Sequence, residues 1–378
     1  MRNDSTIAPL SSTFARVGWL FYVLLIVYAS WYPFSGWQDI GISPFAYVMA
    51  PMPQYWTKFD VLTNIAGYLP LGTLGVFALY PRARGLLAFV LVVVFGVLLA
   101  GTMEAVQIFL PSRVPSNLDL ISNAIGVFLG AIAGVLLTQA LMVNSRTQLT
   151  RRRWFANHAG GVLIMVALWP VAQIYPQGYL FGHGQLTPIL SDWISRFSAV
   201  PIDLGDIVRR GEQLTVEQYW LSEAIITACG LTGALLALLS VLRERAPKKL
   251  LVVVMFASAV TARSLATALQ FSPENAFAWL TPGAQGGLLL GMVMLSGLVF
   301  APAVAQRRVA VMTLCMSLVV VNLAPANPYF VATLQTWVQG KFLNFNGAAQ
   351  FLALAWPFFM LGFLLRRVRP AAHRAEQE

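Results

Sequence analysis

Residues 86–110 read LLAFVLVVVFGVLLAGTMEAVQIFL, a run in which Glu104 is the only charged side chain. The apolar residues are continuous rather than alternating, which favours an α-helix over a membrane β-strand. A helix of about 20 such residues is long enough to cross the roughly 30 Å of hydrocarbon in a bilayer. This stretch therefore predicts a transmembrane helix that carries a carboxylate near one end.

The composition of the whole chain agrees with a membrane location. Of its 378 residues, 58% are hydrophobic and only 11% are charged, against roughly 25% charged in soluble domains. The net charge of +10 comes from basic residues between the apolar runs rather than from one basic module, which argues against a nucleic-acid partner. We expect an all-α, polytopic transmembrane helical bundle with membrane lipids around it.

Ten apolar runs predict ten spans, near 15–33, 62–80, 86–110, 119–142, 158–175, 219–242, 250–271, 284–303, 309–325 and 347–366. If both termini lie in the cytoplasm, 18 of the 25 lysines and arginines fall in cytoplasmic segments and six in outer ones. Cytoplasmic loops of membrane proteins carry an excess of basic residues. The sequence therefore predicts ten spans with both the N-terminus and the C-terminus inside.

The spans group into three predicted units: a four-helix domain at 15–142, a second four-helix unit at 158–303 with an outer loop at 176–218, and two terminal spans at 309–366. Gly-x-x-x-Gly pairs at Gly126–Gly130 and Gly287–Gly291 lie about 160 residues apart. Glu223 follows Asp60 by a similar distance. These recurrences indicate degenerate parallel repeats, a common arrangement in membrane proteins.

Polar residues gather near the predicted outer ends of the second, third and fourth spans. They are Asp60 and Asn64, Glu104 and Gln107, Arg113 in the following loop, and Asp119 and Asn123. Within each span the two residues are three or four apart, so they share one helix face. The connections between these spans are short, so we expect the polar groups to converge. Charged groups in a membrane are costly and usually have a partner or a task, which makes this cluster a candidate ligand-binding site.

Two structural roles compete with ligand binding. Asp60 and Asp119 stand where helix N-caps are expected, and carboxylates suit that position. Glu104 could form an ion pair with Arg113 or with Lys58. Alternatively, a buried Glu104 has the properties of a catalytic acid or base.

The outer loop at 176–218 is net acidic and contains a predicted short helix. Its apolar face consists of Ile189, Leu190, Trp193, Ile194 and Phe197. Such a helix either lies in the outer membrane interface or packs on the bundle as a lid.

In the second unit, Arg263 stands about two turns inside the predicted outer rim. Glu223 on the preceding span is expected at similar depth. We predict a structural ion pair between these two residues.

The first third of the chain resembles the VanZ-like family. The matching motifs are Phe59-Asp60 with Asn64, Pro70-Leu71-Gly72, Glu104 with Gln107, Arg113, and Asp119-Leu120 with Asn123, Gly126 and Gly130. Family members often carry a further acid between the arginine and the last aspartate, whereas residues 114–118 here read VPSNL. The resemblance implies a membrane protein of the cell envelope, associated with low-level resistance to the glycopeptide teicoplanin or with exopolysaccharide functions.

Three functions are open at this point. The first is binding of a lipid, lipid-linked or glycan headgroup at the outer face, and the second is an enzyme that uses Glu104 on a lipid-linked substrate. The third, a transporter, is disfavoured because the cytoplasmic halves of the spans are almost purely apolar. The three histidines are scattered, so we predict no metal site and no cofactor. The arginine-rich and alanine-rich composition favours a bacterial inner membrane.

Overall fold

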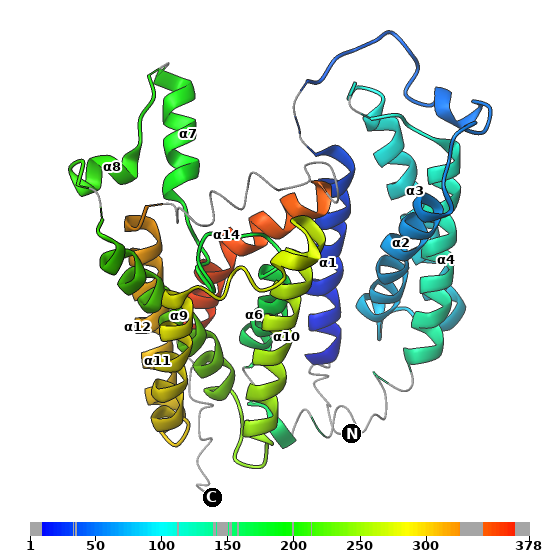
Figure 1. Cartoon of the computed structure of the whole chain (residues 1–378). Coiled ribbons are helices and arrows are strands. Elements are labelled where there is room, and N and C mark those ends of the chain that lie inside the picture. The colour runs from blue at the N-terminus through cyan, green and yellow to red at the C-terminus, as the bar shows by residue number, and fades with distance from the viewer. Residues whose placement is uncertain are drawn as a thin grey trace, which may run out of the picture. The chain divides into compact units, whose positions relative to one another are not determined.

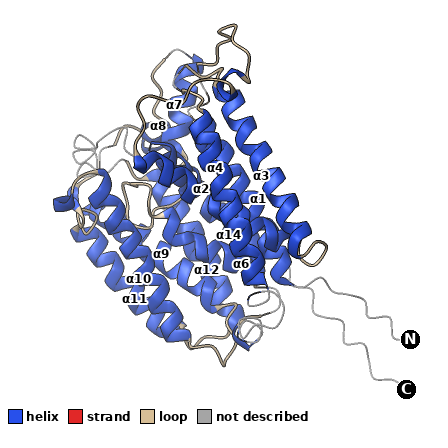
Figure 2. Cartoon of the chain, turned by 90° about the vertical axis from the view of Figure 1, so that its right-hand side faces the viewer, coloured by secondary structure: helices blue, strands red, loops and turns tan. Residues whose placement is uncertain are grey.

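The computed structural model describes residues 10–366, except positions 33, 35, 112, 139–140, 142–149, 151–152, 157–158, 199, 213 and 326–342. The elements in this part of the chain are α-helices and short 3-10 turns joined by loops (Figure 1, Figure 2). The one strand-like pairing among these residues is an isolated bridge between Phe155 and Leu242. The predicted all-α fold is therefore confirmed.

The chain divides into two compact units, residues 1–152 and residues 153–378. Unit 1 contains the helices α1 (Leu10–Trp31), α2 (Lys58–Leu79), α3 (Gly85–Gln107) and α4 (Asn117–Thr138). A short 3-10 turn, η1 (Ala46–Val48), lies in the loop between α1 and α2.

Helices α2 and α4 form the closest helix pair in unit 1. A Cβ atom added at Gly130 would overlap the carbonyl oxygen of Leu69, and one added at Gly126 would overlap that of Ile65. Only glycine allows two backbones to approach this closely, as in other small-residue crossings between membrane helices. Leu71 of α2, which is fully buried, fills the core beside this crossing.

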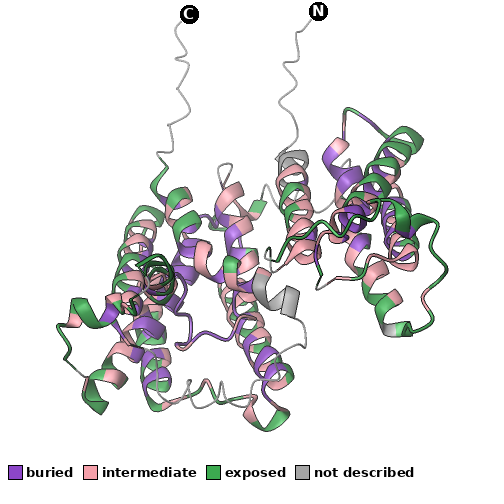
Figure 3. Ribbon diagram, turned by 90° about the horizontal axis from the view of Figure 1, so that it is seen from above, coloured by how far each residue is buried: buried purple, intermediate pink, exposed green. Residues whose placement is uncertain are grey.

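Unit 2 is built around α9 (Val216–Leu239), which is buried along most of its length. Within each unit, exposed residues lie mainly on the outer sides of the helices and buried ones between them (Figure 3). Its other elements are α6 (Gly160–Ala172), α7 (Thr187–Ser198), α8 (Leu204–Arg209), α10 (Lys248–Gln270), η3 (Pro273–Asn275), α11 (Pro282–Leu298), α12 (Ala303–Leu323) and α14 (Leu343–Leu365). Helices α11 and α12 both pack along α9, and α14 packs along α6. The largest fully buried side chains of the unit are Trp169 and Trp356.

The helix pair α9–α11 has the same register of contacts as α2–α4. Gly287 approaches the carbonyl oxygen of Ala224, and Gly291 lies against Ala228. The partner residues are again four apart, as Ile65 and Leu69 are. In this register Ala224 corresponds to Ile65, so Glu223 corresponds to Asn64. The sequence had matched Glu223 with Asp60, which lies one helical turn before Asn64.

The segment between α6 and α7 is irregular but buried. Tyr179, Phe181 and His183 are all nearly inaccessible to solvent. The backbone is held by side chains, because Thr227 donates a hydrogen bond to the carbonyl of Leu180. Buried backbone polar groups need hydrogen-bond partners within the protein, and this bond provides one of them.

Each of the ten predicted spans coincides with a helix in the structure. Seven of these helices are long and apolar enough to cross a bilayer, while α1, α6 and α11 provide shorter apolar segments. Helix α6 has 13 residues, which gives a length of about 20 Å, short of a full crossing. The count of ten crossings and the orientation of the termini remain predictions.

Candidate functional site

The predicted polar cluster lies at one end of unit 1, where α3 ends and α2 and α4 begin. Glu104, in the last turn of α3, is only 4% exposed. Its Oε2 accepts a hydrogen bond of 2.9 Å from the backbone N–H of Ser116, just before α4. The antiparallel course of α3 and α4 thus brings a buried carboxylate to the start of α4.

Asp119 and Asn64 join α4 to α2. The amide Nδ2 of Asn64 donates a hydrogen bond of 2.8 Å to Oδ1 of Asp119. The charge of Asp119 also interacts electrostatically with Glu104 on one side and with Asp60 on the other. The three carboxylates predicted from sequence therefore lie within electrostatic range in a chain, Glu104 to Asp119 to Asp60.

The N-cap role proposed for the two aspartates is wrong in detail. Thr57 caps α2, and Asp60 completes a capping box because its Oδ2 accepts hydrogen bonds from the N–H and the hydroxyl of Thr57. At α4, the hydroxyl of Ser116 accepts from the N–H groups of Leu118 and Asp119. Since threonine and serine fill the cap positions, both carboxylates stand inside the first turn.

Gln107 and Arg113, two of the predicted site residues, both donate hydrogen bonds to the end of α1. Gln107 donates a hydrogen bond to the carbonyl of Ser30, and Arg113 donates to the carbonyls of Ala29 and Tyr32. These carbonyls lie at the end of α1, where backbone acceptors lack helical partners. Burial lowers the pKa of Arg113, and the nearby charge of Glu104 acts in the opposite direction. The two side chains therefore fasten α1 to the site.

Asn123 provides an acceptor that has no partner. It is 4% exposed and lies four residues after Asp119, on the same face of α4. Its Oδ1 is buried without a hydrogen-bond partner within the described part of the chain. Leaving a buried acceptor unpaired is costly, so this oxygen is suited to a donor supplied by a ligand.

Tyr47 is a further site residue that the sequence reasoning missed. It belongs to the loop between α1 and α2, is 5% exposed, and donates a hydrogen bond of 3.0 Å to the carbonyl of Gly101. Burial and the adjacent charge of Glu104 both raise its pKa. No spacing signal distinguishes Tyr47 among the many aromatic residues of this loop.

The site is rich in acceptors and poor in free donors. Each carboxylate uses one oxygen in the described hydrogen bonds and has a second oxygen outside them. The guanidinium of Arg113, in contrast, donates to backbone carbonyls. In the described part of the chain, no group of three or more His, Cys, Asp or Glu side chains has the arrangement of a metal site. The arrangement therefore favours a ligand that donates several hydrogen bonds and carries positive charge.

The predicted pair of Glu223 and Arg263 has other partners in unit 2. Arg263, which is nearly inaccessible, donates hydrogen bonds of 2.9 and 2.6 Å to the carbonyls of Tyr175 and Gln177. Glu223 lies against Gly283 at the start of α11 and is hydrogen-bonded to Thr281. An ion pair between Glu223 and Arg263 is not among those formed by the described residues. The irregular segment after α6 supplies carbonyls that the sequence could not reveal, and these take the arginine.

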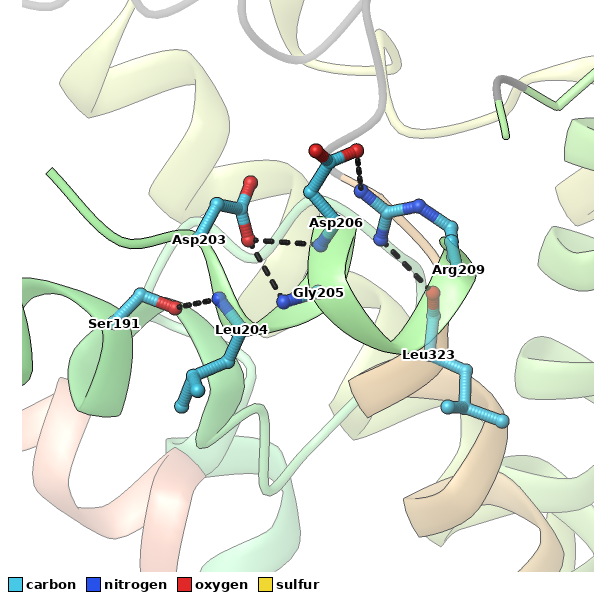
Figure 4. Close-up of polar contacts among 7 residues, drawn as sticks. All are labelled: Ser191, Asp203, Leu204, Gly205, Asp206, Arg209 and Leu323. Carbon is cyan, nitrogen blue, oxygen red and sulfur yellow. Dashed lines mark hydrogen bonds and ion pairs between the residues drawn. The ribbon is translucent and has the colours of Figure 1, made fainter. Parts of the chain in front are cut away.

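Acidic residues in the segment between α7 and α9 make local contacts. Oδ1 of Asp203 accepts from the N–H groups of Gly205 and Asp206, which caps α8 (Figure 4). Arg209 donates to the carbonyl of Leu323 and lies 3.9 Å from the Asp206 carboxylate. Ser191 of α7 accepts from the N–H of Leu204. These contacts tie α7 and α8 together and fasten α8 to the end of α12.

The predicted amphipathic helix in this loop is present as α7. Its Trp193 and Phe197 are exposed, the latter by 97%, and Leu190 and Ile194 are exposed as well. The lid alternative requires this apolar face to pack on the bundle, whereas the structure leaves it uncovered. Whether α7 lies in the membrane interface remains a prediction.

These features define a class of protein: a multi-pass membrane protein made of apolar helices, with a cluster of carboxylates and amides at the end of its first four. Residues 19–138 match the model of the VanZ/LLP1 family. The N-terminal third of the chain therefore resembles this family, as its motifs indicated, and the match encloses α2, α3 and α4 with every candidate residue of the cluster. No curated protein and no solved structure matches the chain.

Proposed function

We propose that unit 1 binds the headgroup of an envelope lipid or glycan at the outer face of a bacterial inner membrane. The observation that carries this proposal is the set of acceptors formed by the buried Glu104, the half-buried Asp119 and the unpaired, buried Oδ1 of Asn123. An ammonium group fits such a set best, since it provides three N–H donors and a positive charge. A hydroxyl-rich headgroup provides donors without the charge and is the second choice.

The VanZ-like character of the domain supports an envelope role. Glycopeptide resistance of the kind linked to the family's namesake would follow if binding changed the availability of an envelope component at the cell surface. We place the site on the outer face because the positive-inside pattern puts the start of α2 and the end of α3 there.

Native mass spectrometry with matched lipids tests the proposal. The full-length protein is exposed separately to phosphatidylethanolamine, phosphatidylcholine and phosphatidylglycerol with identical acyl chains. We expect the strongest adduct with phosphatidylethanolamine, because its ammonium combines a positive charge with N–H donors. The choline group has the charge without the donors, and the glycerol group has donors without the charge. A dominant phosphatidylglycerol adduct would instead favour the hydroxyl-rich headgroup.

Variants connect the adduct to the site. Glu104→Gln keeps an acceptor for the Ser116 N–H and removes the charge, and Asp119→Asn removes a second charge. Each is expected to weaken the phosphatidylethanolamine adduct by about tenfold or more, the effect of losing a hydrogen bond to a charged group. Glu244→Gln, an exposed change in unit 2, is the matched control and should bind as the wild type does. Equal adducts in all four proteins would return the carboxylates to a structural role.

A further inference from the structure

The loop between α1 and α2 presents an exposed apolar surface beside the carboxylate cluster. Residues 36–57 contain one charged side chain, Asp39. The exposed apolar and aromatic residues of this stretch include Ile40, Ile42, Phe45, Met49, Met52, Tyr55 and Trp56. Met49 is 91% exposed and Tyr55 is 94% exposed, and exposed patches of this kind mark membrane or ligand contacts.

This exposure does not come from a detached loop. The N–H of Gln38 donates a hydrogen bond of 2.9 Å to the carbonyl of Phe109, just beyond α3. Asn117, the first residue of α4, donates one of 2.6 Å to the carbonyl of Ala50. Tyr47 is buried against α3 at Gly101. The backbone is therefore held against the ends of α3 and α4, while the side chains on either side of Tyr47 remain uncovered.

The loop is fastened at the same points that form the polar cluster. Gly101, which accepts from Tyr47, is three residues before Glu104. Asn117, which holds Ala50, is two residues before Asp119. The exposed loop is thus fastened within three residues of both Glu104 and Asp119.

Other apolar side chains of unit 1 are exposed as well. Val114, between α3 and α4, is largely exposed, and so is Leu98 on the outer half of α3. Exposed apolar side chains therefore occur on α3, on the connection between α3 and α4, and on loop 36–57. Acidic groups near such side chains are complementary to an amphiphile with a cationic head.

We propose that the ligand of the carboxylate cluster is a membrane amphiphile with an ammonium headgroup, and that its hydrocarbon chains lie on loop 36–57. This inference rests on the proposed function and adds the class of the ligand and its route, laterally from the outer leaflet. The carboxylates would hold the head, and Met49, Tyr55 and their neighbours would cover the chains. Aromatic side chains such as Trp56 and Tyr55 suit this depth, because they are enriched at membrane interfaces.

The test compares a lipid with its own headgroup. Binding of dioleoyl phosphatidylethanolamine and of glycerophosphoethanolamine, which has the same head without chains, is measured on the full-length protein in detergent. The double variant Met49→Ser/Tyr55→Ser removes the two most exposed loop side chains and should leave the fold intact. Met312→Ser, an exposed change on α12, is the matched control.

We expect the wild type to bind the lipid at least tenfold more tightly than the deacylated headgroup. The double variant should lose about tenfold in affinity for the lipid, the effect of uncovering roughly one large apolar side chain, and should bind the deacylated headgroup as the wild type does. The control variant should bind both as the wild type does.

Three results would overturn the inference in distinguishable ways. Equal affinity for the lipid and for the deacylated headgroup, with both lost in Glu104→Gln, would leave the proposed function standing and remove the role of the chains. Undiminished lipid binding in the double variant would place the chains elsewhere on the protein. Absence of binding by either compound to the wild type would contradict the proposed function as well.

Discussion

At the scale of single residues, the candidate site is decided by what each polar group is bonded to. Glu104 and Asp119 each keep an oxygen free of the described hydrogen bonds, and Asn123 keeps its carbonyl oxygen. Arg113 and Gln107 are instead directed to the carbonyls at the end of α1. Ligand binding is therefore assigned to the acceptors, and support of the helix ends to the donors.

His183 in unit 2 provides a pH-dependent test of the buried segment after α6. Burial lowers the pKa of His183 to about 3, and its ring is bonded to the Phe181 carbonyl and the Gln173 amide. The folded state therefore holds the neutral ring while the unfolded state takes up a proton near pH 6.5. The contribution of His183 to the free energy of unfolding is therefore at its full value above about pH 6.5, and it is lost as the pH falls toward 3.

We expect the wild type to lose more thermal stability between pH 8 and pH 5 than His183→Gln loses over the same range. The measurement is the unfolding temperature of both proteins in the same detergent, with pH 8 as the internal reference. Identical pH dependence of the two proteins would show that His183 is not buried in its neutral form.

At the scale of elements, the sequence predicted helix positions well and side-chain partners poorly. All ten apolar runs coincide with helices because hydropathy is a property of the run itself. The partners of Arg113 and Arg263 are backbone carbonyls, and a carbonyl carries no sequence signal. The burial of the irregular segment around Phe181 was missed because its glycines and polar residues, such as Gly182, His183 and Gly184, are typical of an exposed loop.

The glycine crossing of α2 and α4 gives an element-scale prediction. Gly130→Ala forces a Cβ atom against the Leu69 backbone, so the helices must separate and the protein should lose roughly 1–3 kcal/mol of stability. Gly67→Ala, in α2 of the same pair, meets nothing within 4 Å. It should be neutral or stabilising by up to about 1 kcal/mol, because alanine favours the helix.

Thermal unfolding of the two variants beside the wild type checks this contrast. A loss of the same size in both would indicate a general intolerance of substitution. Equal stability of Gly130→Ala and the wild type would contradict the close approach of the two backbones.

At the scale of the whole molecule, the two units share one helix-pair register but differ in their polar groups. The α2–α4 pair carries Asn64 bonded to Asp119, whereas α9 carries Glu223 bonded to Thr281 at the matching place. Unit 2 also lacks a counterpart to Glu104 among its described residues. Helix α3 ends at Gln107 and helix α10 ends at Gln270. Three residues before these ends stand Glu104 in α3 and Thr267 in α10. The acceptor cluster is therefore a property of the VanZ-like unit.

The central claim is that Glu104 recognises an ammonium headgroup, and a crossed affinity measurement tests it most directly. Phosphatidylethanolamine and phosphatidylglycerol of identical acyl chains are each titrated into the wild type and into Glu104→Gln. The account predicts that the substitution weakens phosphatidylethanolamine binding by about tenfold or more and leaves phosphatidylglycerol binding unchanged. Equal losses for the two lipids, or no loss for either, would contradict it.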